Sequence, residues 1–134
     1  MNILLINHYA GSPRHGMEYR PYYLAREWVR LGHRVQIVAA SWSHVRSVQP
    51  APAGGEVIDE TIDGIAYRWL PTPPYGGNGV GRVLNIWAFL KQLWREAPRW
   101  ASEFRPDAVI ASSIYPMDIW VARRIARLAV AKLV

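Results

Sequence analysis

The stretch Asn2-Ile3-Leu4-Leu5-Ile6-Asn7, followed by Ala10-Gly11-Ser12-Pro13-Arg14-His15-Gly16, decides the fold of this chain. The first six residues form a near-continuous apolar run, which is typical of a strand buried on both faces of a parallel sheet. The second segment carries two glycines among polar side chains, so we expect a loop there. Together with a helix over residues 17–31 and a strand over residues 33–40, this pattern predicts a βαβ unit. Open parallel sheets bind ligands beyond the carboxyl ends of their strands, where this loop falls.

The remaining sequence continues the alternation of strands and helices. Asp63-Gly64 is a strong hairpin signal between two strand-like segments. The expected elements are a polar loop (41–55), two hairpin strands (56–62 and 65–70), a Pro/Gly-rich loop (71–81), a helix (82–99), a strand (108–111), a helix (118–128) and the opening of a further strand (131–134). The predicted fold class is α/β: a Rossmann-like parallel sheet with flanking helices and a small β-hairpin excursion.

Composition limits the classes of protein to which the chain can belong. With 134 residues, 51% of them hydrophobic, it supports one domain with a sizeable core. No segment approaches the ~20 apolar residues of a membrane-spanning helix, and no signal-peptide pattern is present, so a cytoplasmic protein is expected. The absence of cysteine excludes disulfides, and the four histidines lack metal-site spacing, so no metal is expected. The formal charge of +6 favours anionic partners: phosphates, anionic lipids or nucleic acid.

Several nucleotide-binding and hydrolase motifs are missing. The glycines of residues 76–81 do not have G-x-G-x-x-G spacing and do not follow a first strand, and no Walker A, G-x-S-x-G or H-E-x-x-H pattern occurs. The loop after the first strand is the better candidate, because Gly11 and Gly16 permit close approach of a ligand and the next helix offers free amides to a phosphate. The alternative is that both glycines only satisfy turn geometry.

Four segments of the sequence carry a resemblance to a known family: Ile3-Leu4-Leu5-Ile6-Asn7-His8-Tyr9, Gly16-Met17-Glu18, Leu24-Ala25-Arg26-Glu27 and Leu31-Gly32-His33-Arg34-Val35. They resemble the amino-terminal domain of family 4 glycosyltransferases of the GT-B fold. Within that family, residues 16–28 and the later Pro-Asp-x-Val-Ile-Ala-Ser-Ser string (106–113) are most similar to transferases of O-antigen and capsule synthesis, such as those for N-acetylated fucosamine. The resemblance is specific in residues 1–46 and 105–113 and weak in residues 47–100.

The resemblance implies a retaining transferase that moves a sugar from a nucleotide diphosphate sugar to a lipid-linked or polysaccharide acceptor. Family members have two Rossmann-like domains, with the donor held mainly by the second and the acceptor mainly by the first. The chain then corresponds to the acceptor-side domain over residues 1–134, truncated at its C-terminus, without the donor domain and inactive alone. No cofactor, metal or catalytic residue is implied within it. A cytoplasmic location on the inner face of the cell membrane is expected.

The resemblance also suggests site residues. The loop Gly11, Ser12, His15 and Gly16 would lie near the donor; relatives carry a Gly-Gly pair where this chain has His15 and Gly16. Many relatives place a histidine after the strand corresponding to residues 108–111, whereas this chain has Ser112 and Ser113, to which we assign hydrogen bonding to sugar or acceptor and no proton transfer.

Three further residues are candidates for contact with the acceptor or a phosphate. Glu18 would orient an acceptor hydroxyl or accept its proton, or else only favour a helix start. Arg20 would hold a phosphate, or pair with Glu18 or Glu27 at the surface. His8 would face the cleft, or be a hydrogen-bonded loop histidine.

The helix predicted over residues 82–99 has two interpretations. Its apolar stripe (Val83, Ile86, Trp87, Leu90, Leu93, Trp94 and Ala97) is assigned to the core. Residues outside that stripe are candidates for contact with an anionic membrane surface, which suits a lipid-linked acceptor: Arg82, Phe89, Lys91, Arg95 and Arg99.

Two other functions remain as alternatives. One is the nucleotide-binding half of an epimerase or dehydrogenase, but Ser41, Trp42 and Ser43 stand where an acidic ribose ligand would be expected. The other is a nucleic-acid-binding module, but the arginines are spread through the chain rather than grouped.

Overall fold

A single six-stranded sheet forms the centre of the computed structural model, which describes residues 1–50, 55–77 and 79–134. The strands are arranged in the order β3-β4-β2-β1-β5-β6. Their bounds are β1 (Asn2–Ile6), β2 (Arg34–Ala40), β3 (Ile58–Ile62), β4 (Ile65–Leu70), β5 (Ala108–Ala111) and β6 (Lys132–Leu133). All neighbouring pairs are parallel except β3–β4. The predicted α/β class, the hairpin at Asp63-Gly64 and the strand at the end of the sequence are confirmed.

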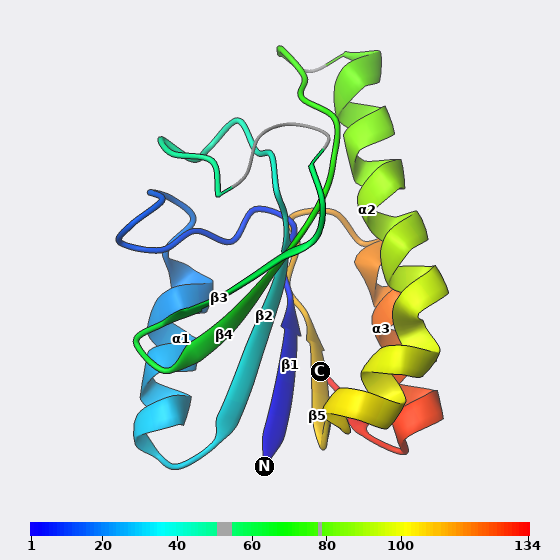
Figure 1. Cartoon of the computed structure of the whole chain (residues 1–134). Coiled ribbons are helices and arrows are strands. Elements are labelled where there is room, and N and C mark those ends of the chain that lie inside the picture. The colour runs from blue at the N-terminus through cyan, green and yellow to red at the C-terminus, as the bar shows by residue number, and fades with distance from the viewer. Residues whose placement is uncertain (51–54, 78) are drawn as a thin grey trace.

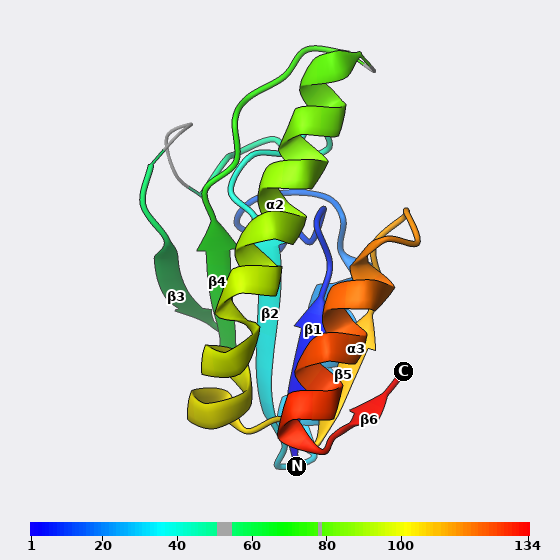
Figure 2. The ribbon, with the colours of Figure 1, turned by 90° about the vertical axis from the view of Figure 1, so that its right-hand side faces the viewer.

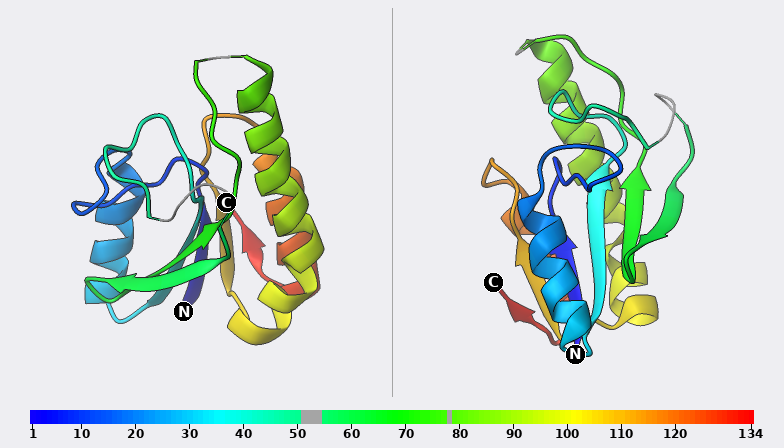
Figure 3. Two further views of the ribbon diagram at one scale, coloured as in Figure 1. Left: turned by 45° about the horizontal axis from the view of Figure 1, so that its top comes forward. Right: turned by 90° about the vertical axis from the view of Figure 1, so that its left-hand side faces the viewer.

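The hairpin and β6 lie at opposite edges of the sheet (Figure 3). β6 pairs with β5 through Ala108↔Lys132 and Val109↔Leu133. The loops predicted over residues 41–55 and 71–81 fall partly on residues 51–54 and 78, which lie outside the described residues.

Helices cover both faces of the sheet. α1 (Arg20–Arg30) lies on one face, while α2 (Val80–Arg99) and α3 (Asp118–Ala129) lie together on the other (Figures 1 and 2). Pro21 stands in the first turn of α1, where its missing N–H costs no helical hydrogen bond. Gly32 follows the helix with φ +86°, a left-handed conformation that favours glycine.

The second helix begins two residues before its predicted start and ends at the predicted residue, Arg99. Pro98 lies inside α2, and the chain then winds into the π-helix η1 (Trp100–Phe104). Arg105 ends this turn with φ 51°, in the left-handed region. The sequence did not predict η1.

The core has one layer on each side of the sheet. In β1, Leu4 and Ile6 belong to the cluster beneath α2 and α3, and Ile3 and Leu5 belong to the cluster beneath α1. This alternation explains why the first strand is apolar throughout, since both of its faces are covered.

The predicted core stripe of α2 is wrong in part. The helix buries Asn85, Phe89, Leu93 and Ala97, a ridge with a spacing of four residues. Phe89 is fully buried, so its predicted contact with a membrane is also wrong. The residues of the predicted stripe that are instead exposed are Val83 (65%), Trp87 (64%) and Trp94 (48%).

Candidate functional site

The carboxyl ends of β1, β2, β4 and β5 lie side by side and form the carboxyl edge of the sheet, which is distinct from the two lateral edges formed by β3 and β6. The loops that follow them, together with the start of α2, rise above this edge (Figure 1). Most of the residues predicted to form a site lie here, and the fold brings together segments that are far apart in sequence. His8 and Ser113, separated by 105 positions, meet through a hydrogen bond from the His8 amide to Ser113 Oγ of 3.1 Å.

His8 is a buried anchor of this edge. Its Nε2 lies 2.7 Å from Asn85 Oδ1 and its Nδ1 lies 2.8 Å from the Tyr115 hydroxyl. Because Asn85 Nδ2 donates to the Pro73 carbonyl, its Oδ1 must accept, so the proton of the neutral ring resides on Nε2 and Tyr115 donates to Nδ1. Burial lowers the pKa of His8 to about 3, against the raising effect of the Asn85 hydrogen bond. The ring is fully buried. His8 therefore has the surroundings of a hydrogen-bonded loop histidine and not of a side chain that faces a cleft.

The two serines after β5 lie beside this anchor. Asn7 Nδ2 donates to the Ser112 carbonyl at 2.7 Å, and the Ser113 amide donates to the buried carboxylate of Asp118 at 2.9 Å. Both serines are only partly buried. The strand end is therefore held in place by its backbone while two hydroxyl groups remain near the surface.

Tyr115 lies with His8, Ser113 and Asp118 beyond the ends of β1 and β5. Burial, with the nearby Asp118 carboxylate as a further cause, raises the pKa of Tyr115 above its usual range. Its hydroxyl therefore stays protonated and acts as a hydrogen-bond donor. No sequence pattern pointed to Tyr115, although it stands two residues beyond the serine pair.

The loop that follows β1 is closed by its own hydrogen bonds. The amides of His15 and Gly16 both donate to the Ser12 carbonyl, and the Gly11 amide donates to the Glu18 carbonyl. A Cβ on Gly11 would lie 1.8 Å from the Gly16 carbonyl oxygen, and Gly16 has φ +94°. Both glycines are thus required by the loop itself, as the turn-geometry alternative predicts.

Ser12, His15 and Glu60 form a chain of polar groups under this loop. Ser12 Oγ lies 2.7 Å from His15 Nδ1, and His15 Nε2 lies 3.2 Å from Glu60 Oε1. This is the order of a nucleophile, a base and an acid, but Ser12 is fully buried and its Oγ also accepts the amides of Arg14 and His15. The arrangement therefore fixes the loop and does not present a nucleophile. Burial lowers the pKa of His15, and the Glu60 carboxylate opposes this shift.

Arg46, a buried arginine outside the predicted site, lies between the surroundings of His8 and the polar groups under the loop. Arg46 donates to the carbonyls of His8, Ala40 and Ser41, and its guanidinium lies 4.9 Å from the centre of the Trp69 ring. Burial lowers the pKa of Arg46 to about 9. No carboxylate pairs with it among the described residues, so carbonyl dipoles stabilise its charge. No sequence pattern distinguishes this arginine from the exposed ones.

Glu18 and Arg20 lie at the start of α1. Glu18 is partly buried and Arg20 is exposed. In residues 1–50, 55–77 and 79–134, neither makes an ion pair, and Glu27 instead pairs with Arg26 and Arg30. The alternative for Arg20, a surface pairing with Glu18 or Glu27, is therefore not formed.

The basic candidates for membrane contact have different surroundings. Lys91, Arg95 and Arg99 are exposed, and Arg99 pairs with Glu103 at 3.0 Å. Arg82 is partly buried, and its Nε lies 3.3 Å from the Tyr9 hydroxyl.

The described residues include no group of three or more His, Cys, Asp or Glu side chains placed to hold a metal ion. None of the described helices is long and apolar enough to cross a membrane.

Comparison with known proteins agrees with this architecture. A family model described as a glycosyl transferase 4-like domain matches residues 15–134. No curated protein matches the chain. Among solved structures, the C-terminal domain of a hydrogenase from Pyrococcus furiosus is similar, with a TM-score of 0.62, 14% identity, and coverage of 98% of this chain and 87% of that chain. At this identity the likeness shows the fold alone. The family match spans most of the sequence, and the chain therefore belongs to the glycosyl transferase 4-like family.

Proposed function

We propose that this chain is the acceptor-side domain of a retaining glycosyltransferase. The enzyme would transfer a sugar from a nucleotide diphosphate sugar to a lipid-linked or polysaccharide acceptor in cell-surface glycan synthesis, of the O-antigen type. The observation that carries this proposal is the family match over residues 15–134, which includes every helix and five of the six strands. The proposed location is the cytoplasmic face of the cell membrane, with the protein bound peripherally.

The hydroxyl-rich end of β5 supports the acceptor role. Ser112 and Ser113 are partly buried and are held by Asn7, His8 and Asp118. Sugars are bound through hydrogen bonds from fixed polar groups, and a fixed backbone reduces the entropy cost of ordering such groups. Glu18 and Arg20 would contribute a carboxylate and a guanidinium near the start of α1.

The loop after β1 supports a secondary role toward the donor. Because the amides of His15 and Gly16 already donate to Ser12, the loop does not offer them to a phosphate. We propose that Gly11, Ser12, His15 and Gly16 form a rigid wall beside the donor, while a further domain holds its diphosphate. Transfer needs both substrates in one geometry, so the 134 residues alone would bind acceptor without transferring sugar.

Amide NMR titration of the purified chain tests this function. A short-chain prenyl diphosphate carrying an N-acetylhexosamine is the acceptor probe, and NAD⁺ and duplex DNA are comparison ligands. We expect saturable shifts at Ser112, Ser113 and Glu18 with the glycan probe. The double variant Ser112→Ala/Ser113→Ala should weaken binding about tenfold, since two hydrogen bonds are lost.

Ser102→Ala is the matched control, because this exposed serine lies in η1, near the amino ends of the strands, where Asn2 of β1 donates to the Phe104 carbonyl. Saturable binding of NAD⁺ or DNA at the same residues, without a response to the glycan probe, would overturn the acceptor role. Sugar transfer by the 134-residue chain alone would overturn the proposed division between domains.

A further inference from the structure

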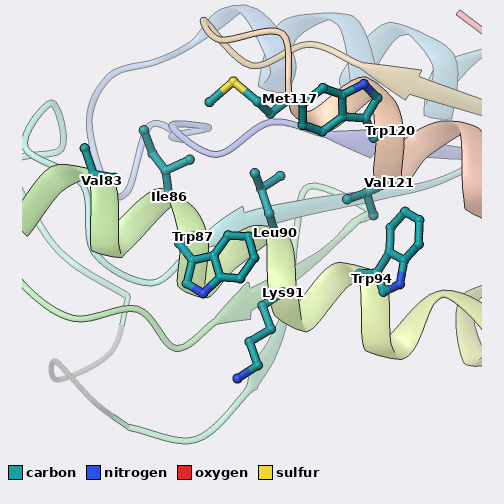
Figure 4. A pocket seen from close by; sticks show the side chains of 9 residues that line it. All are labelled: Val83, Ile86, Trp87, Leu90, Lys91, Trp94, Met117, Trp120 and Val121. Carbon is teal, nitrogen blue, oxygen red and sulfur yellow. The ribbon is translucent and has the colours of Figure 1, made fainter.

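An apolar groove on the outer side of α2 and α3 is left without a partner in the described structure. It is lined by Val83, Ile86, Trp87, Leu90, Lys91 and Trp94 from α2, and by Met117, Trp120 and Val121 from the start of α3 (Figure 4). Its volume is about 390 Å³. We propose that this groove is the surface through which the protein docks on an anionic lipid bilayer. The proposal rests on the proposed function, in which the acceptor is carried by a lipid.

The groove exists because α2 has two apolar faces. One face packs Phe89, Leu93 and Ala97 into the core. The other carries Val83, Trp87 and Trp94, and α2 continues beyond the start of α3, so the upper part of this second face lacks a helical neighbour (Figure 2). Contiguous exposed apolar residues rimmed by polar side chains are typical of an interaction surface.

Aromatic residues on the groove favour a membrane interface as its partner. Trp87 and Trp120 are each 64% exposed and stand on opposite walls. Tryptophan is enriched at the level of lipid headgroups, where its ring contacts apolar chains and its indole N–H contacts water. Figure 4 shows the Lys91 side chain directed away from the apolar floor, as expected for a cation that meets headgroups.

The charge around the groove selects an anionic surface. A second hollow of about 410 Å³ shares Trp94 and Trp120 with the groove and is lined by Arg123, Arg124 and Arg127. The Arg124 guanidinium lies 4.6 Å from the centre of the Trp94 ring. No acidic residue lines either hollow in the part of the chain that the structure describes. Basic residues grouped on an amphipathic surface are attracted to anionic lipids.

The same charges disfavour a second copy of the chain as the occupant. A two-fold symmetric dimer through this groove would place identical patches face to face. The positive patch of Lys91, Arg123 and Arg127 would then face the same positive patch of the other copy, and like charges placed together destabilise an interface.

Vesicle flotation measures the docking directly. The vesicles contain equal parts of phosphatidylglycerol and phosphatidylcholine, and pure phosphatidylcholine vesicles serve as the neutral comparison. We expect the chain to float with the anionic vesicles and to be released by added salt. The double variant Trp87→Ala/Trp120→Ala should bind roughly tenfold more weakly, and Arg123→Gln/Arg127→Gln should lose about fivefold per arginine.

Matched controls come from the opposite face of the sheet. Tyr23→Ala/Leu24→Ala removes exposed apolar side chains of α1, which are 48% and 40% exposed. Arg26→Gln/Arg30→Gln removes the same number of charges from α1, where the two side chains are 35% and 63% exposed. Both controls should bind vesicles like the original chain, which separates the local patch from net charge. Quenching of tryptophan fluorescence by brominated lipid in the unaltered chain gives a second test that does not depend on any variant folding.

Three results would overturn the proposal: unchanged flotation of the tryptophan variant, equal binding to neutral vesicles, or no quenching by brominated lipid. A dimer in sedimentation equilibrium that the tryptophan variant dissociates would assign the groove to a second copy instead, and would overturn it as well. The glycan titration uses a soluble probe without vesicles. Loss of vesicle binding with intact glycan binding would therefore overturn only this inference, and the reverse result would overturn only the acceptor role.

Discussion

The loop of residues 10–18 and the first half of α2 stand above the same edge of the sheet, but they use their side chains in opposite ways (Figure 1). In the loop, the polar residues Ser12 and His15 are buried, with 0% and 4% exposure. On α2, the apolar residues Val83 and Trp87 are 65% and 64% exposed. The difference shows that hydrogen-bond partners and neighbouring elements, rather than side-chain polarity, decide burial at this edge.

Substitutions of two aromatic residues on α2, two positions apart, test the contrast between its two faces. Phe89→Ala should lower the free energy of unfolding by about 3–5 kcal/mol, because it leaves a cavity in the core beside His8. Trp87→Ala should change it by no more than about 0.5 kcal/mol, since that side chain is largely in water. Urea denaturation of both variants measures the difference. Equal losses would mean that Trp87 also belongs to the core.

Gly11→Ala tests whether the loop is closed by its own backbone. The new Cβ would lie 1.8 Å from the Gly16 carbonyl oxygen, so the loop must open. We expect a loss of about 3 kcal/mol in the free energy of unfolding. Gly76→Ala is the matched control, because nothing lies within 4 Å of the added atom, and its effect should stay within about 0.5 kcal/mol. A mild effect at Gly11 would show that the loop is adaptable enough to admit a ligand.

The βαβ unit and the hairpin were predictable because their signals are local. The apolar run of β1, the Asp63-Gly64 turn and the helical repeat of α1 each lie within a few residues of one another. The handedness rule for parallel strands then restricts how the helix crosses between β1 and β2.

The buried face of α2 and the buried polar groups were not predictable in the same way. Two apolar stripes lie side by side on α2, and periodicity alone does not say which one meets the sheet. Asn85 is buried because His8 and the Pro73 carbonyl, both distant in sequence, bond to it. Arg46 is buried because three carbonyls converge on it. Such contacts appear only when the chain is folded.

The pH dependence of stability should report the buried state of His8. Its pKa falls from 6.5 to about 3 on folding, so below pH 6.5 the unfolded chain binds a proton that the folded chain does not. The contribution of neutral His8 to the free energy of unfolding is therefore complete above pH 6.5 and falls by up to about 1.4 kcal/mol per pH unit as the pH drops toward 3. His15, whose pKa burial also lowers, contributes in the same direction.

Denaturation of the original chain and of His8→Gln between pH 7 and 5.5 isolates this effect, because carboxylates titrate mainly below that range, near pH 4. The variant should be less stable at pH 7 and show a shallower decline. An unchanged slope in the variant would mean that His8 titrates normally in the folded chain.

Glu60→Gln tests the polar chain beneath the loop. Its carboxylate accepts from Trp69 Nε1 at 2.7 Å and lies near Arg14 and His15. The amide keeps one acceptor but loses the charge, so we expect a loss of about 1 kcal/mol by urea denaturation. Glu103→Gln, which removes an exposed pairing with Arg99, should cost less than about 0.5 kcal/mol. If both losses are equally small, Glu60 does not hold the loop. His15 would then be free to turn outward while Ser12 stays held by the amides of Arg14 and His15, and the loop would resemble α2 in leaving a side chain available to a partner.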